Sequence, residues 1–228
     1  MNNQSSTQII QLEYTDEMIE RAYKKAEELG ALRGSTTEGA GNFAGYLGEE
    51  AVANYLGVRV SSCDDGDAKF HYDMTWANQK IDVKTKKRGY GVPRLNFDGS
   101  LETFNTRQKC DSYIFASISY RNKNYYNPYE NPRDEHRDIL AIHLCGIINK
   151  DEYYNKATFH KKGTIDPTNG YEFRKDRYNL LYSEMHPVKI SDKCEICGDG
   201  NPKQIKGINA CNSCDSIYSL ERSLEVYR

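Results

Sequence analysis

Two aspartates and a lysine stand at a spacing that suits metal-assisted chemistry on phosphate esters. Asp82 and Lys84 are separated by one residue in a segment with strand-like alternation, so their side chains are expected on the same face. If the preceding connection is the two-residue turn Ala77-Asn78, Asp73 lies directly opposite Asp82. Directly opposed residues have Cβ atoms about 5 Å apart, where two carboxylates repel each other. Such a pair requires a bound cation or a shared proton. With a turn one residue longer the pair becomes diagonal, still within reach of one ion.

The chemistry that this set favours is hydrolysis of a phosphodiester. Carboxylates suit Mg²⁺, or Mn²⁺ in its place, which polarises the scissile phosphate and lowers the pKa of its bound water. Lys84 is then expected to orient that water or to stabilise negative charge in the transition state. The backbone carbonyl of Val83, between Asp82 and Lys84, is a candidate further ligand of the metal. The spacing alone fits an ordinary charged strand surface equally well, so the neighbouring elements must decide.

A predicted helix before the hairpin carries two adjacent carboxylates. Apolar residues from Phe43 to Leu56 wrap most of the helix circumference, which predicts a buried helix that ends at Gly57. A buried helix rarely carries a pair such as Glu49 and Glu50 unless these are paired, capped or functional. A helical wheel does not show which of the two faces the hairpin.

The other elements are predicted from apolar periodicity and from turn residues. An amphipathic helix is expected at Thr15–Leu29, followed by a Gly/Ser/Thr-rich loop at Gly34–Gly41. Strands are expected at Phe70–Trp76 and Lys80–Lys86, with a short helix near Thr103–Lys109 after an irregular stretch at Gly89–Gly99. Buried strands are expected at Tyr113–Tyr120 and Ile139–Ile148, a long insertion at Arg121–Arg137 and a short helix at 149–156. From there to Ile190 the sequence is weakly patterned.

The order of these segments resembles that of PD-(D/E)xK nucleases. That superfamily has a helix of the form G-x-x-G-E, then Tyr-Asp, then (D/E)-x-K at the end of the next strand. The corresponding segments here are Gly45-Tyr46-Leu47-Gly48-Glu49, Tyr72-Asp73 and Ile81-Asp82-Val83-Lys84-Thr85. Cys110-Asp111-Ser112-Tyr113 and Gly146-Ile147-Ile148, which enter a strand and a helix, also look like members of this group. The resemblance covers residues 43–156 and rests on the order of the elements.

The resemblance implies an α/β fold of the restriction-endonuclease type, a central mixed β-sheet flanked by helices. It implies that Asp73 and Asp82 are metal ligands and that Lys84 is the catalytic lysine. Glu49 would ligate the metal or orient water, with Glu50 as the alternative. One departure is that Tyr72 stands where the motif has proline.

Near the C-terminal end, four of the seven cysteines form a CxxC-x13-CxxC motif: Cys194, Cys197, Cys211 and Cys214. Two CxxC turns complete a tetrahedral Zn²⁺ site, and four cysteine ligands make that zinc structural. An Fe–S cluster and a redox pair are the alternatives; an HNH nuclease would need a His-Asn-His arrangement that the cysteines lack. We therefore expect a nuclease domain with an N-terminal helix over residues 1–190 and a zinc-binding module over 191–228, which grips DNA or caps the nuclease.

Composition sets the class of the protein. The chain has 228 residues, of which 38% are hydrophobic and 28% charged, and a formal net charge of −2. No apolar run approaches the roughly 18 residues that span a bilayer, and the N-terminus lacks the order of a secretory signal. We expect a cytoplasmic protein with no membrane partner, possible settings being a virus, phage or mobile element. With this charge balance, a nucleic-acid enzyme must gather its cations locally, as in Lys80, Lys84, Lys86, Lys87, Arg88 and Arg94.

These observations predict a Mg²⁺-dependent DNA endonuclease. Two alternatives stay open from the sequence. One is a DNA-binding protein whose nuclease fold has lost activity, and the other is an RNA nuclease or junction-resolving nuclease that uses the same residues. A homodimer, which double-strand cleavage can require, is also left open.

Overall fold

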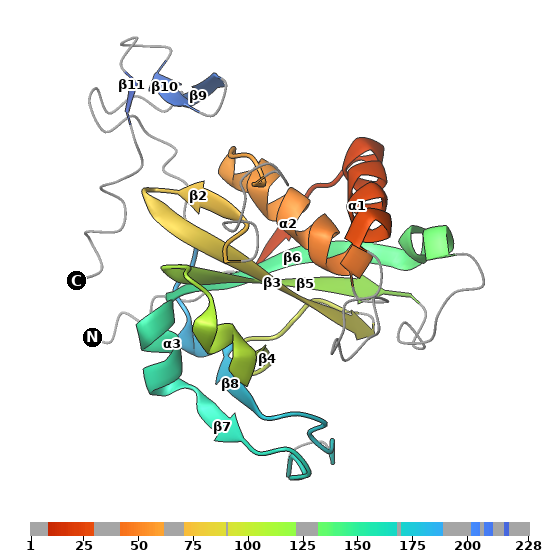
Figure 1. Ribbon diagram of the computed structural model, residues 1–228. Coiled ribbons are helices and arrows are strands. Elements are labelled where there is room, and N and C mark those ends of the chain that lie inside the picture. Colours follow the sequence, from red (N-terminus) through yellow and green to blue (C-terminus); the bar gives the residue numbers. More distant parts are fainter. Residues whose placement is uncertain are drawn as a thin grey trace, which may run out of the picture.

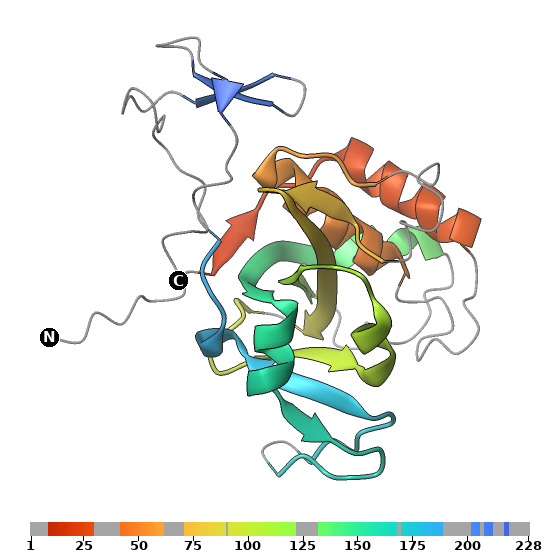
Figure 2. The ribbon, with the colours of Figure 1, turned by 60° about the vertical axis from the view of Figure 1, so that its left-hand side comes forward.

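The computed structural model describes residues 9–29, 42–61, 71–89, 91–121, 132–167 and 170–188, together with the backbone of three strands between residues 202 and 218. A mixed five-stranded β-sheet is flanked by helices on one face and by a smaller sheet on the other (Figures 1 and 2). The predicted α/β class, with a central mixed sheet between helices, is therefore confirmed. In the part of the chain that is described, no helix is long and apolar enough to cross a membrane.

The central sheet has the strand order β1-β6-β5-β3-β2. Its strands are β1 (Ile10–Leu12), β2 (Met74–Trp76), β3 (Gln79–Gly89), β5 (Ser112–Tyr120) and β6 (Ile139–Asn149). β3 and β5 pair in parallel, whereas the other neighbours are antiparallel. The strands β5 and β6 are buried along almost their whole length, which confirms the prediction from their continuous apolar runs. β2 pairs with β3 only from Gln79 to Ile81, so the rest of β3 has no strand on that side in the described chain.

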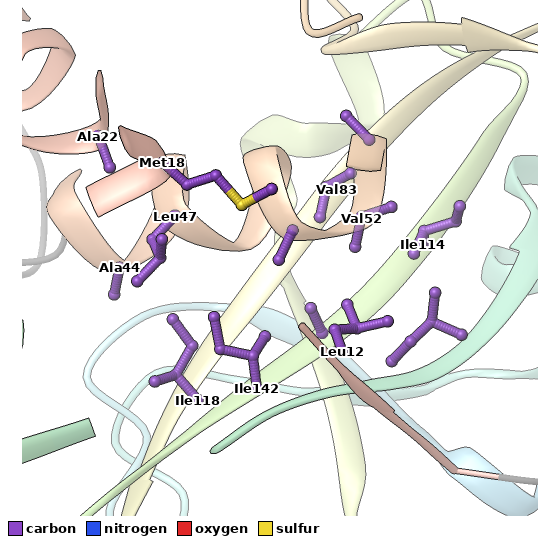
Figure 3. Close-up of a cluster of buried hydrophobic side chains, with 14 of the residues drawn as sticks. Leu12, Met18, Ala22, Ala44, Leu47, Val52, Val83, Ile114, Ile118 and Ile142 are labelled. Atoms are coloured by element: carbon purple, nitrogen blue, oxygen red, sulfur yellow. The ribbon is translucent and has the colours of Figure 1, made fainter. Parts of the chain in front are cut away.

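Helices α1 (Asp16–Leu29) and α2 (Asn42–Leu56) cover one face of this sheet. The predicted apolar stripe of α1 is buried at Ile19, Ala22 and Tyr23, and α2 is buried around most of its circumference, as predicted. Figure 3 shows side chains of both helices meeting residues of β1, β3, β5 and β6 in one apolar cluster. Each large aliphatic side chain that is fully buried in this way contributes roughly 1.5–3 kcal/mol. This packing fixes α2 against β3.

The opposite face is covered by a three-stranded sheet of order β4-β8-β7 and by helix α3 (Lys150–Lys156). The strands are β4 (Asp98–Glu102), β7 (Thr158–His160) and β8 (Arg177–Leu181). Tyrosine and phenylalanine rings fill the space between the layers; Phe115 and Tyr153, for example, stack with ring centroids 5.6 Å apart. A Cβ at Gly99 would lie 2.4 Å from the Phe115 ring, so β4 approaches β5 only because it carries glycine there.

Several predicted boundaries are wrong. The predicted strand at Phe70–Trp76 is reduced to β2, with residues 71–73 outside any strand, and the irregular stretch at Gly89–Gly99 already contains the end of β3 and the start of β4. The predicted helix at Thr103–Lys109 is a 3₁₀ helix, η2 (Thr103–Arg107). The predicted insertion ends in a second one, η3 (Pro132–Asp138), and a third, η4 (Tyr182–Glu184), follows β8. Two strands of the small sheet, β7 (Thr158–His160) and β8 (Arg177–Leu181), lie in the weakly patterned stretch before Ile190.

Towards the C-terminus, the strands β9 (Pro202–Ile205), β10 (Ile208–Cys211) and β11 (Ile217–Tyr218) form an antiparallel sheet. Cys211 is the last residue of β10, and only its backbone is described. Cys194, Cys197 and Cys214 lie outside the described residues, as does the whole predicted loop at Gly34–Gly41. The zinc site and the division of the chain at residue 190 therefore stay predictions.

Candidate active site

A tight hairpin sets the two aspartates opposite each other. Ala77 and Asn78 have φ values of 48° and 60°, as the two-residue type I′ turn requires. The register Met74↔Ile81 then places Asp73 across from Asp82, and the Asp73 N–H donates to the carbonyl of Ile81 at 2.8 Å. Of the two turn lengths that the sequence left open, the two-residue turn is the one present.

The Asp73 carboxylate is held in place by the backbone of the partner strand. Its Oδ2 accepts a hydrogen bond from the Val83 N–H at 2.6 Å. The carbonyl oxygen of Val83 as a metal ligand stays a prediction. Asp73 is thus fixed by the hairpin itself rather than by a side chain from elsewhere.

Among the predicted site residues whose side chains are described, Asp82 is the most enclosed, with only 3% of its surface exposed. Its Oδ1 accepts a hydrogen bond from Gln108 Nε2 at 3.0 Å, and its Oδ2 lies 2.6 Å from Lys84 Nζ. Although it forms this ion pair, Oδ2 has no aligned hydrogen-bond donor among the described residues. One oxygen of the carboxylate is therefore oriented by the protein, and the other faces the lysine.

The two glutamates of α2 have different surroundings. Glu50 is 9% exposed and is paired with α1, since Arg21 Nη2 lies 2.9 Å from its Oε2 and Lys25 Nζ lies 3.4 Å from its Oε1. Glu49 lies within electrostatic range of Asp73 and Asp82. The structure thus brings Glu49 to the aspartates and uses Glu50 to join the two helices.

The three carboxylates disfavour one another's ionisation. Burial, reinforced by Asp73, raises the pKa of Glu49 well above its ordinary value. Burial and the charge of Asp82 raise the pKa of Asp73 to about 7, and burial raises the pKa of Asp82. Burial alone would lower the pKa of Lys84, but Asp82 and Asp73 outweigh it and raise that pKa. Repulsion among the carboxylates is therefore relieved when one of them binds a proton, or when a cation binds beside the Lys84 ammonium group.

The carboxylate oxygens of Glu49, Asp73 and Asp82 are of the chemical type that binds a divalent cation. Three carboxylates and one ammonium group sum to −2 when ionised, and the buried Oδ2 of Asp82, which faces Lys84, is a hard oxygen donor of the kind that Mg²⁺ prefers. As the side chains stand, no group of three or more His, Cys, Asp or Glu residues in the described part of the chain is arranged around a common point that would hold a metal. The Lys84 ammonium group instead contacts Asp82 directly.

Two residues of the site were missed by sequence reasoning. Gln108 orients Asp82, and Lys150 Nζ donates to the backbone carbonyl of Gln108. Gln108 follows η2 in an irregular segment, where no periodicity marks it. Lys150 belongs to the predicted short helix, but nothing in its spacing shows that it reaches the loop. Nearby, Asp111 ties this loop to β3, since its Oδ2 accepts from the Lys80 N–H at 2.8 Å.

Comparison with known proteins gives no relative for this chain: no protein-family model, curated protein or solved structure matches it.

Asp73→Asn is expected to change how stability depends on pH in the metal-free protein. Because the folded pKa of Asp73, about 7, is raised above its unfolded value near 3.8, its stabilising contribution is present below about pH 4 and is lost as the pH rises through 7. Asparagine keeps the oxygen that accepts from Val83 but carries no charge. At pH 8 in EDTA the variant should therefore be more stable than wild type, by on the order of 1 kcal/mol after allowance for its partial exposure.

Urea denaturation at pH 5 and pH 8 measures this difference. The stability gain of the variant should shrink at pH 5, where Asp73 is protonated in the wild-type protein. Parallel pH profiles for the two proteins would show that Asp73 is ordinarily ionised and not repelled by Asp82.

Proposed function

We propose that this protein is a Mg²⁺-dependent DNA endonuclease, with Mn²⁺ as a substitute, of the PD-(D/E)xK type. The observation that carries the proposal is the meeting of Glu49, Asp73, Asp82 and Lys84, which come from a helix, an irregular segment and a strand. Three repelling carboxylates beside one lysine are unfavourable for stability, and such arrangements are concentrated at functional sites. If β3 were only a charged surface strand, nothing would require Glu49 of α2 to lie near Asp73 and Asp82.

The arrangement of the elements also supports a restriction-endonuclease-like fold. A helix that carries Glu49 is followed by the hairpin β2-β3, and β3 then pairs in parallel with β5. The order of the helix and the two hairpin segments is the one on which the resemblance rests. The zinc module at residues 191–228 remains part of the proposal, with Cys194, Cys197, Cys211 and Cys214 as ligands.

Each residue has a role in this proposal. Asp73 and Asp82 would hold the cation, and Glu49 would ligate it or orient the attacking water. A cation bound there supplies Lewis acidity and an activated water. The Lys84 ammonium group stabilises the negative charge that builds up on the phosphate, and the Gln108 amide keeps one Asp82 oxygen in a fixed direction.

The test is cleavage of plasmid DNA by the purified protein with Mg²⁺, Mn²⁺ or EDTA. Lys84→Ala should reduce the rate by about 100-fold or more, the usual effect of removing a group that stabilises the transition state. Lys80→Ala is the matched control, because Lys80 lies on the same face of β3 but is exposed, and its variant should cut within a few-fold of wild type.

The substrate panel separates the proposal from its rivals. Single-stranded, branched and RNA substrates are tested beside the plasmid. An RNA nuclease would cleave RNA fastest, and a junction-resolving enzyme would cleave the branched substrate fastest. If the wild-type protein binds DNA but cuts none of these substrates in any metal, the chain is a binding protein and the endonuclease proposal fails.

A further inference from the structure

An open cavity of about 310 Å³ lies on the same side of the central sheet as the small sheet. It is lined by Glu102, Thr103, Phe104, Lys162, Lys175 and Asp176. The 3₁₀ helix η2 connects it with the carboxylate cluster, because Gln108, which binds Asp82, comes directly after η2. A 3₁₀ helix rises about 2.0 Å per residue and Gln108 follows η2 in an extended conformation, so Phe104 and Gln108 are roughly 9 Å apart along the chain. Adjacent nucleotides of one strand can therefore reach the cavity and the cluster together.

The lining combines an aromatic ring with cations and anions. The Phe104 side chain is 60% exposed at the cavity, although apolar rings of this size are usually buried. Lys162 is exposed. Its backbone N–H donates a hydrogen bond to Asp176 Oδ1 at 2.7 Å, which holds the Lys162 backbone beside Asp176. Lys175 pairs with Glu102 at 3.1 Å. Since two carboxylates balance two ammonium groups, the cavity does not suit a free phosphate ion.

We propose that this cavity binds an unpaired nucleotide of the substrate strand, next to the phosphodiester that is cut. The base stacks on Phe104, which is the common way in which proteins hold single-stranded nucleic acid. The Lys162 side chain, which also lines the cavity, contacts the phosphate of the same nucleotide. A paired base remains stacked inside its duplex and does not enter, so the cavity selects substrates with single-stranded positions. This inference rests on the proposed function and names its substrate class.

Binding is measured by fluorescence anisotropy with a labelled oligothymidylate and with a labelled duplex of the same length, in EDTA so that nothing is cut. The wild-type protein should bind the single strand several-fold more tightly than the duplex. Phe104→Ala should weaken single-strand binding by about tenfold, the effect typical of losing one stacking partner. Lys162→Ala should weaken it by about threefold through loss of one phosphate contact.

Two matched controls isolate the cavity. Phe159 is 48% exposed on β7 and Lys161 precedes Lys162, but neither lines the cavity. Phe159→Ala and Lys161→Ala should bind within twofold of wild type. If they weaken binding as much as the cavity variants, the attraction is general and the inference is overturned; equal affinity for single strand and duplex, or no binding to either, overturns it too.

Cleavage assays with the same proteins separate the two proposals. Nucleic-acid binding that depends on Phe104, together with equally inert wild-type and Lys84→Ala proteins, would support the cavity and reject the endonuclease. Lys84-dependent cleavage whose KM is unaffected by Phe104→Ala on a single-stranded substrate would support the endonuclease and reject the cavity.

Discussion

Glu49→Gln is expected to reduce DNA cleavage by about 100-fold or more while the protein stays folded. The substitution keeps the size of the side chain and removes the charge that the proposal assigns to the metal or the water. Because burial and the charge of Asp73 raise the pKa of Glu49, removing the Glu49 charge should not lower the thermal stability of the metal-free protein. Stabilisation by added Mg²⁺, measured as the shift in melting temperature, should decrease in the variant.

Glu50→Gln is the matched comparison, one residue further along the same helix. It removes the partner of Arg21 and Lys25, so it should destabilise the protein by about 1–2 kcal/mol. The loss is expected below that of a fully buried pair because the Arg21 side chain is 52% exposed and can be hydrated. Cleavage per folded molecule should stay within a few-fold of wild type. The opposite pattern in the two variants would make Glu50 the active-site glutamate.

Gly48→Ala is expected to destabilise the protein by about 2 kcal/mol, whereas Gly45→Ala should stabilise it by roughly 0.5–1 kcal/mol. A Cβ at Gly48 would lie 2.0 Å from Thr85 Oγ1 and 2.9 Å from its Cγ2, whereas a Cβ at Gly45 meets nothing within 4 Å. Both changes raise the helix propensity of α2 by the same amount, so the difference between them measures the clash with β3. Urea denaturation of both variants gives this difference.

The double variant Gly48→Ala/Thr85→Ala tests the cause. It should recover most of the lost stability, because it removes both Thr85 atoms that the new methyl group approaches most closely. A double variant as unstable as Gly48→Ala would place the strain elsewhere. The cleavage rate should likewise fall in Gly48→Ala and recover in the double variant, since Glu49 is the next residue and moves with the helix.

The parts of the site that are local in sequence were predictable. Alternation in β3 and a two-residue turn suffice to set Asp73 opposite Asp82, because register in a hairpin is fixed by the turn. The strands β5 and β6 were predictable because burial on both faces leaves continuous apolar runs.

The parts that depend on distant contacts were not predictable. The choice between Glu49 and Glu50 depends on Arg21 and Lys25, which belong to another helix. In the small sheet, β4 pairs with β8 from Asp98↔Leu181 to Glu102↔Arg177, and both strands are short and partly exposed. Gln108 acts from an irregular segment. Neither periodicity nor turn residues mark such features.

The short pairing of β2 with β3 has a consequence for handling the protein. From Asp82 onward β3 lacks a strand neighbour on one side in the described chain, and exposed strand edges of this kind promote aggregation unless charged residues block them. The cations Lys84, Lys86, Lys87 and Arg88 belong to this stretch of β3, but their side chains are partly buried and pair with Asp82, Asp98 and Glu135. Replacing several of them at once would therefore leave enclosed carboxylates without partners beside an uncovered strand, and the cations of β3 are best neutralised one at a time.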